Sequence, residues 1–219
     1  MKKRLWLAIA LFLLCSGSIS WGAEEPVKAT GDSVWGDTQK KWANLEGNVR
    51  IVQGKTVITA EKAEIDLDKK LLYLKSRLKL VSSEVTVEAD GLDYNMRLKQ
   101  GTFRGNVIMN RMEVKDAGGQ VAKDAFKLFA SVLYFETETK NFSATGQGRV
   151  EHKDFRGTAD QITYNDGKQE LSFQKHAYLK KPSGEEIRGD TVNIDLKAKN
   201  FKVRENVNMN IQVDDDKKD

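Results

Sequence analysis

The sequence predicts an all-β protein: a folded antiparallel β-jelly roll, V-shaped and twisted, built from repeats around an apolar interior groove. Three observations predict this fold. Apolar residues alternate with polar ones at a period of two, short polar turns separate the alternating runs, and one short pattern recurs six times. The pattern is a small residue, then Asp, Glu or Ser, then any residue, then apolar residues two apart.

The six copies of this pattern are regularly spaced. They start at residues 31, 60, 89, 130, 159 and 189, which gives intervals of 29, 29, 41, 29 and 30 residues. A longer echo overlies them, because residues 88–109 align with residues 188–209 without a gap. The interval of 41 residues holds an insertion around Met112 to Phe126, and this insertion leaves the number and register of the central strands open. The chain is a repeat protein.

Each repeat is β rather than α. Period two places Leu92, Tyr94, Met96 and Leu98 on one face of a sheet, with polar residues on the other face. Hairpin turns are expected at residues 68–70, 165–168 and 182–184, of which the Asp-Gly pair in residues 165–168 is the strongest signal.

The repeated pattern also predicts a bend. The small residue and the next inward apolar residue stand three apart, as in Ala89 to Leu92 and Ala159 to Ile162. Because three is odd, the in/out alternation flips there, which a β-bulge at the small residue would produce. The acid beside it should cap the bend and face outward. Six bends in line would fold the sheet along a crease into a double layer.

The inward residues are the candidate binding residues. For any one of them, packing in the core of a β-sandwich is the simpler interpretation. As a set, they would line a trough, because an open V does not seal its ends or its mouth, and flexible Met and Leu side chains suit acyl chains. The predicted lipid-contacting residues are Ile65, Leu72, Leu74, Leu78, Leu92, Tyr94, Met96, Val107, Met109, Leu133, Phe135, Phe142, Ile162, Tyr164, Leu171, Phe173, Val192, Ile194, Phe201 and Met209.

The N-terminus has the form of an export signal. Residues 1–22 combine three basic residues, an apolar stretch from Leu5 to Cys15 and small residues before a cut after Gly22. An uncleaved anchor is the rival interpretation, although eleven apolar residues are short for a bilayer, which needs about 17–25. We expect a periplasmic protein with a domain at 28–211 and a charged, disordered tail at 212–219.

Charge and cysteine usage limit the partners. The chain has a formal charge of +4, and the signal carries three of these charges, so the remainder is near +1 and argues against nucleic acid as a partner. Cys15 is the only cysteine, and it leaves with the signal. The mature chain then forms no disulfide.

Nothing in the sequence predicts an enzyme, a metal site or a cofactor. His152 and His176 lie on different predicted strands and have no ligand spacing. The recurring acids stand about 29 residues apart, unlike the dense Gly-Asp repeats of calcium-binding β-rolls. A periplasmic β-helix enzyme acting on polysaccharide through Asp90, Asp160 and Asp190 is an alternative, but the hairpin turns favour antiparallel neighbours.

Two strings resemble a known family. Residues Leu45–Ile51 (LEGNVRI) and Ile58–Asp68 (ITAEKAEIDLD) resemble the OstA-like signature of lipopolysaccharide-transport proteins, with further copies at Phe103–Met109 and Phe155–Asp166. The resemblance covers about residues 28–211.

The resemblance implies a β-jelly roll that holds lipid A acyl chains in its groove and has no catalytic residues. It implies lipopolysaccharide as a partner, together with like β-jelly-roll domains of inner-membrane and outer-membrane transport components, and head-to-tail joining into a homo-oligomer. The expected role is a soluble bridge that carries the glycolipid from the inner to the outer membrane. A membrane-anchored docking subunit of the same machinery is the alternative.

Overall fold

The computed structural model describes residues 26–210, which form strands and no helix. The predicted signal at 1–22 and the tail at 212–219 lie outside the described residues. The strands are β1 Lys28–Thr30, β2 Ser33–Asp37, β3 Trp42–Gln53, β4 Thr56–Asp66, β5 Leu71–Leu74, β6 Leu78–Val81, β7 Val85–Ala89, β8 Gly91–Asn95, β9 Gln100–Arg111, β10 Val114–Lys115, β11 Val121–Lys123, β12 Phe126–Glu136, β13 Phe142–Glu151, β14 Arg156–Asn165, β15 Glu170–Lys180, β16 Glu186–Asp195, β17 Asn200–Arg204 and β18 Asn208–Asn210.

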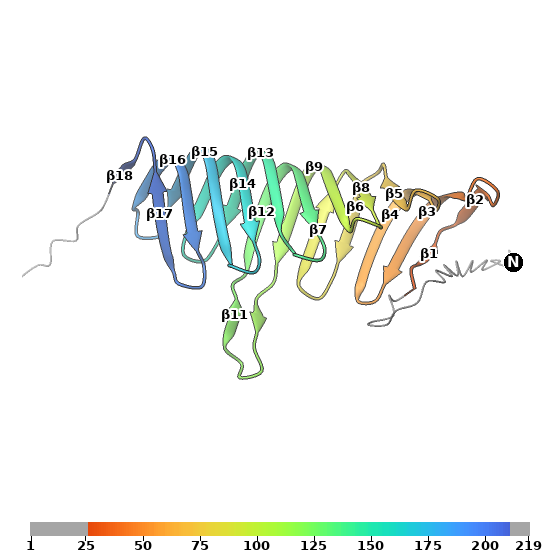
Figure 1. Cartoon of the computed structure of the whole chain (residues 1–219), viewed down its shortest axis with the longest axis horizontal. Coiled ribbons are helices and arrows are strands. Elements are labelled where there is room, and N and C mark those ends of the chain that lie inside the picture. Colours follow the sequence, from red (N-terminus) through yellow and green to blue (C-terminus); the bar gives the residue numbers. More distant parts are fainter. Residues whose placement is uncertain (1–25, 211–219) are drawn as a thin grey trace, which may run out of the picture.

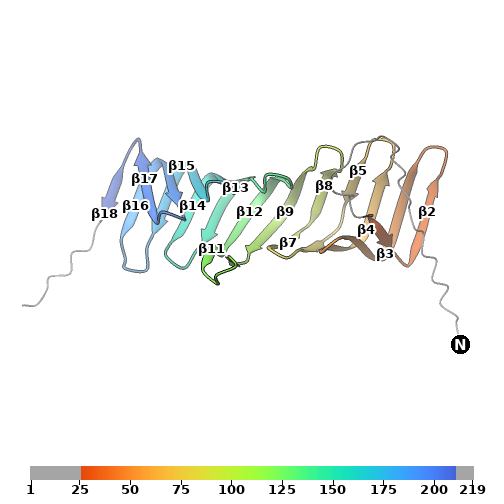
Figure 2. The ribbon, with the colours of Figure 1, turned by 60° about the horizontal axis from the view of Figure 1, so that its bottom comes forward.

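One antiparallel sheet of sixteen strands makes up the body of the protein. From β9 to β17 the strands of this sheet pair in chain order; before it, β4 pairs with both β5 and β6, which pair with β8 and β7, and these two both pair with β9. Strands β10 and β11 form a separate two-stranded hairpin. Figure 1 shows the strands side by side along an elongated molecule, from β2 at one end to β18 at the other, and Figure 2 shows the same order after a turn of 60°. The predicted antiparallel all-β fold is confirmed.

The sheet folds along a crease. Where two paired strands cross this crease, one strand has one residue more than its partner. Between β14 and β15, Ala159 and Asp160 lie opposite the three residues 175–177. Lys175 and His176 have left-handed backbone, with φ of 61° and 54°. The same pair of left-handed residues recurs at the crease as Gly47-Asn48, Gly105-Asn106, Gly146-Gln147 and Glu205-Asn206.

The predicted bend at each small residue and acid is therefore found, but the extra residue was assigned to the wrong strand. In five of the six copies it belongs to the following strand, which crosses the crease with two left-handed residues; after Ala60 the following segment is instead divided into β5 and β6. Inward residues are three apart on the strand with the acid, from Ala159 to Ile162, and four apart on its neighbour, from Phe173 to Ala177. That difference of one is the bulge.

The acids cap the crease, as the sequence predicts, and most of them are exposed. Each aspartate accepts a hydrogen bond from a side chain sixteen residues later, on a left-handed residue of the bulge. The four pairs are Asp32 with Asn48 Nδ2 (2.8 Å), Asp90 with Asn106 Nδ2 (2.7 Å), Asp160 with His176 Nδ1 (2.8 Å) and Asp190 with Asn206 Nδ2 (2.6 Å). The aligned residues of the long echo, Asp90 with Asn106 and Asp190 with Asn206, are thus bonded partners.

The crease divides the strands into two layers. Layer 1 contains the arms that end at the turns 38–41, 67–70, 96–99, 137–141, 166–169 and 196–199. Layer 2 contains the arms that end at 54–55, 82–84, 112–125, 152–155 and 181–185. Their inner faces share one apolar core; for example, the rings of Phe155 in layer 2 and Phe173 in layer 1 are 6.2 Å apart. The edge opposite the crease, where these turns lie, is called the mouth below.

The insertion forms the β10–β11 hairpin and leaves the sheet intact. Strands β9 and β12 pair on both sides of it, from Arg111 with Phe126 to Gln100 with Glu136. Figure 1 shows the hairpin projecting beyond the row of strands. Phe126 was wrongly placed in the insertion: it begins β12 and is buried. Leu98 was wrongly placed inward, because the turn after β8 exposes 56% of it.

Candidate functional site

The candidate binding residues lie on the inner faces of the two layers, where they pack against each other. Most of them are buried, and Tyr94, Met96 and Phe135 are partly buried. The buried ones are Ile65, Leu72, Leu74, Leu78, Leu92, Val107, Met109, Leu133, Phe142, Ile162, Tyr164, Leu171, Phe173, Val192 and Ile194. The interior is therefore apolar along its length, and here its side chains fill it.

Both ends of this interior are open to solvent. Phe201 pairs with inward-facing Ile194, and Met209 pairs with Ile187, so both belong to the inner face; they are 37% and 42% exposed. At the other end, Val34 pairs with buried Leu45 and is 36% exposed. The apolar face thus continues to both ends of the sheet.

Several interior residues were missed in the sequence. Phe103 stacks on Phe135 with ring centroids 4.9 Å apart, and Phe126 meets the ring of Tyr164 at 5.4 Å. Phe155 and Leu128 are also buried. The period-two alternation that located the other residues was available for Phe103, whose aligned residue in the longer echo is Val203, whereas Phe126 and Leu128 followed an insertion of unknown register.

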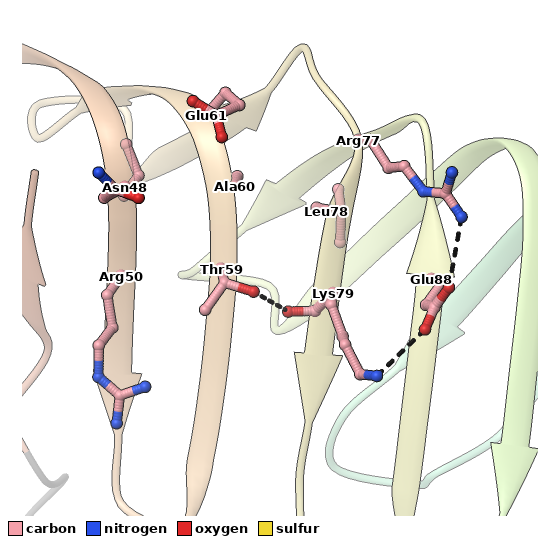
Figure 3. Close-up of a pocket in the computed structure, with 10 residues that line it drawn as sticks. Asn48, Arg50, Thr59, Ala60, Glu61, Arg77, Leu78, Lys79 and Glu88 are labelled. Atoms are coloured by element: carbon pink, nitrogen blue, oxygen red, sulfur yellow. Dashed lines mark hydrogen bonds and ion pairs between the residues drawn. The ribbon is translucent and has the colours of Figure 1, made fainter.

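A hollow of about 480 Å³ lies at the crease, on the polar side of the sheet, where β4 parts from β5 and pairs with β6. Figure 3 shows its charged lining, in which Lys79 and Arg77 both bond to Glu88, at 3.1 and 3.5 Å. Of the twenty predicted residues, only Leu78 lines this hollow, among the described residues. Val49 and Leu78, which line it, belong to the buried core, and most of its other lining residues are charged or polar.

A buried ion cluster joins the two layers at the mouth. Arg111 Nη2 at the end of β9 donates to Asp166 Oδ1 at 2.7 Å, and Lys123 Nζ of the hairpin donates to Asp166 Oδ2 at 2.5 Å. Burial alone would raise the pKa of Asp166, but the hydrogen bonds and positive charges of Lys123 and Arg111 outweigh it and hold that pKa below its usual value. The guanidinium of Arg111 also lies 4.8 Å from the ring of Tyr164, whose pKa burial raises.

The hairpin is fastened to both layers near this cluster. Gln169 of layer 1 donates to the Ala122 carbonyl at 2.8 Å, and Lys153 of layer 2 donates to Asp124 at 2.6 Å. His152 is buried beside Asp124, and its burial lowers its pKa despite the nearby acids. A second ion pair spans the mouth where Lys140 Nζ meets Glu84 at 2.6 Å.

The two histidines have structural surroundings rather than a shared site. His176 belongs to a crease pair with Asp160, and His152 stacks on Phe155 with centroids 4.8 Å apart. Within residues 26–210, no three His, Asp or Glu side chains lie close enough to hold a metal ion.

The comparison with protein families decides the relationship. Residues 28–84 and 86–200 match the model of the LptA/(LptD N-terminal domain) LPS transport protein family. The chain belongs to this family. The match includes the β10–β11 hairpin and ends where β17 begins. Transport of lipopolysaccharide, the role for which the family is named, is not enzymatic.

Among solved structures, the chain is similar to the crystal structure of LptH from Pseudomonas aeruginosa, described as the LptA-homologous periplasmic component of the conserved lipopolysaccharide transport device. The identity is 15%, the TM-score is 0.36, and the likeness covers 86% of this chain and 96% of that one. A search of curated protein sequences finds no match to the chain.

Proposed function

We propose that this member of the lipopolysaccharide-transport family is a periplasmic bridge protein that carries the glycolipid from the inner to the outer membrane. Its acyl chains would be shielded between the two layers. The observation that carries the proposal is the apolar interior, which runs the length of the sheet and reaches solvent at both ends. Transfer of acyl chains from water into such an interior is favourable by about 25 cal/mol per Å² of apolar surface.

The way in which the layers are joined allows the interior to accept a chain. Backbone pairing runs between neighbouring strands, and in residues 26–210 no backbone hydrogen bond joins a mouth turn of layer 1 to one of layer 2. The hydrogen bonds and ion pairs described across the mouth each involve at least one side chain. Parting the layers there therefore costs side-chain contacts and leaves the sheet's hydrogen bonds in place.

The ends of the sheet suit the addition of like domains. In the described part of the chain, β1 and β2 pair only with β3, and β17 and β18 pair only with β16. Such unpaired edges accept a further strand. Head-to-tail addition of other copies, or of like β-jelly-roll domains of the inner-membrane and outer-membrane components, would join the apolar interiors end to end.

Photo-crosslinking tests the proposal. A photoreactive residue at Leu74, Tyr94 or Phe173 should capture lipopolysaccharide, because these side chains face the interior. Lys75 is the matched control, because it adjoins Leu74 in the chain and its ammonium group is exposed and bonded to Glu64 at 2.9 Å. Capture at Lys75 but at none of the interior positions would contradict the proposal.

A further inference from the structure

The ion cluster at the mouth holds one more positive charge than negative. Arg111 and Lys123 share the single carboxylate of Asp166, and the nearby Asp124 is already paired with Lys153. The side chains of Arg111 and Asp166 are 5% and 9% exposed. Burying an unbalanced charge is costly, and even a balanced buried pair gains little over apolar packing. Stability of the fold alone does not explain the cluster.

The other repeats show that the fold does not need a charge at this position. In the repeats, the first residue after a layer 1 strand donates its backbone N–H to the preceding turn at the mouth. Leu67, for example, donates to the Lys41 carbonyl, and Leu196 donates to the Gln169 carbonyl. The residues that follow the layer 1 strands at this point are Leu67, Met96, Thr137 and Leu196, and only the repeat that faces the inserted hairpin has an aspartate, Asp166.

The guanidinium of Arg111 retains unused hydrogen-bonding capacity. Its Nε is buried and has no hydrogen-bond partner among the described residues. A buried donor without an acceptor is costly and rare in folded proteins. An anionic group with several oxygens would satisfy this Nε together with the Nη2 that now bonds to Asp166, because guanidinium groups bind phosphate and carboxylate through two adjacent donors.

The other turns of layer 1 also carry lysines, three of which are paired with an acid: Lys41 with Asp68, Lys99 with Glu138 and Lys140 with Glu84. Five of the six turns of layer 1 place a lysine in left-handed backbone, with φ between 52° and 59°. Such a backbone favours Gly or Asn, so local geometry does not explain the choice of lysine. The lysines are Lys41, Lys70, Lys99, Lys140 and Lys199. The sixth turn has Gln169 there, next to the cluster, where Arg111 and Lys123 supply the positive charge instead.

We propose that Arg111 and Lys123 form a binding site for one anionic group, a phosphate or a carboxylate, in the headgroup of an amphiphile. Asp166 occupies this site in the ligand-free protein and thereby holds the two layers together. The inference rests on the proposed function, since the acyl chains of the same molecule would enter the interior directly behind the site. Exchange of the Asp166 carboxylate for the ligand's anion would remove the ion pairs of layer 1 with Arg111 and Lys123, leaving the bond of Gln169 to Ala122 and the pair of Lys140 with Glu84, and would favour opening of the mouth.

The test uses calorimetric titration of the full chain with dodecyl phosphate, laurate, dodecyl maltoside and inorganic phosphate, the detergents below their micelle concentrations. Wild-type protein should bind dodecyl phosphate or laurate at least tenfold more tightly than dodecyl maltoside. Lys123→Met should weaken only the anionic ligands, by about tenfold, because it removes one charged hydrogen bond. This variant keeps the balanced pair of Arg111 and Asp166, so it should fold. The matched control is Lys127→Met, which removes the same charge from the outer face of β12.

A second variant tests the internal competitor. Asp166→Asn should tighten the binding of dodecyl phosphate by about tenfold, since the carboxylate no longer competes for the cations; weaker or unchanged binding in folded protein would contradict this. If Lys123→Met and Lys127→Met lost affinity for the anionic dodecyl ligands equally, or if neither lost any, the proposed site would be overturned. The proposed function would remain intact. Equal affinity for inorganic phosphate and dodecyl phosphate would show a free-anion site and overturn the amphiphile. Failure of every dodecyl ligand to bind would overturn both proposals.

Discussion

Gly105→Ala should destabilise the protein through the crease. Gly105 has φ of +70°, and an added Cβ would lie 2.5 Å from Asp90 Oδ2. A side chain in left-handed backbone costs about 1–2 kcal/mol. The clash would also displace Asp90 from its 2.7 Å hydrogen bond with Asn106, which contributes about 0.5–1.5 kcal/mol. The expected loss in the free energy of unfolding is about 2–3 kcal/mol.

Urea denaturation followed by circular dichroism measures this loss, and two controls separate its parts. Gly119→Ala has the same kind of backbone, with φ of +79°, but nothing within 4 Å of the added Cβ, and it lies in the hairpin outside the sheet. It should cost clearly less than Gly105→Ala. In a protein that already carries Gly105→Ala, adding Asp90→Ala should lower the free energy of unfolding only a little further. A loss below about 1 kcal/mol for Gly105→Ala, or full additivity with Asp90→Ala, would refute the role given to the crease pair.

Further predictions concern the core, the pH dependence and the N-terminus. Phe173→Ala should lower the free energy of unfolding by about 3–5 kcal/mol, because it leaves a cavity in the fully buried core, whereas its outward neighbour Ser172→Ala should change it little in the same urea titration. Because burial lowers the pKa of His152, its contribution to stability should be complete above the ordinary value of about 6.5 and fall as pH decreases below it; His152→Gln should flatten melting temperature against pH in that window. Since the pKa of Asp166 is lowered, its contribution should persist above about pH 3.8 and disappear as pH falls below it, and Asp166→Asn should remove this acid sensitivity. Mass spectrometry of protein exported from cells should find the chain starting after Gly22; retention of residues 1–22 would instead support the membrane-anchored alternative.

Much of the fold was predictable because the repeats report the same geometry several times. The alternation of apolar residues located most of the interior, and the spacing of three from Ala159 to Ile162 located the crease. The position of the extra residue was not predictable from that spacing. It depends on which of two paired strands carries the left-handed residues, and Lys175 and His176 give no local signal for this, although Gly105-Asn106 does.

The mouth cluster could not be predicted, since it depends on contacts between distant segments. Arg111 and Asp166 stand 55 residues apart, and Lys123 lies at the end of β11, where the inserted hairpin rejoins the sheet. In the sequence, Asp166 has the appearance of an ordinary turn residue next to Gly167. The insertion gave no register from which its contacts could be inferred.

Lipid is proposed to lie between the two layers, and because side chains now fill that space, binding must part the mouth. Spin labels at Ser83→Cys in layer 2 and Glu138→Cys in layer 1, with Cys15 replaced by Ser, flank the ion pair of Glu84 and Lys140. Pulsed electron resonance should show a longer distance between these labels when lipopolysaccharide is bound, while a control pair on the outer face of layer 2, Arg149→Cys and Lys180→Cys, keeps its distance. An unchanged distance across the mouth in protein that has bound lipopolysaccharide would contradict the account.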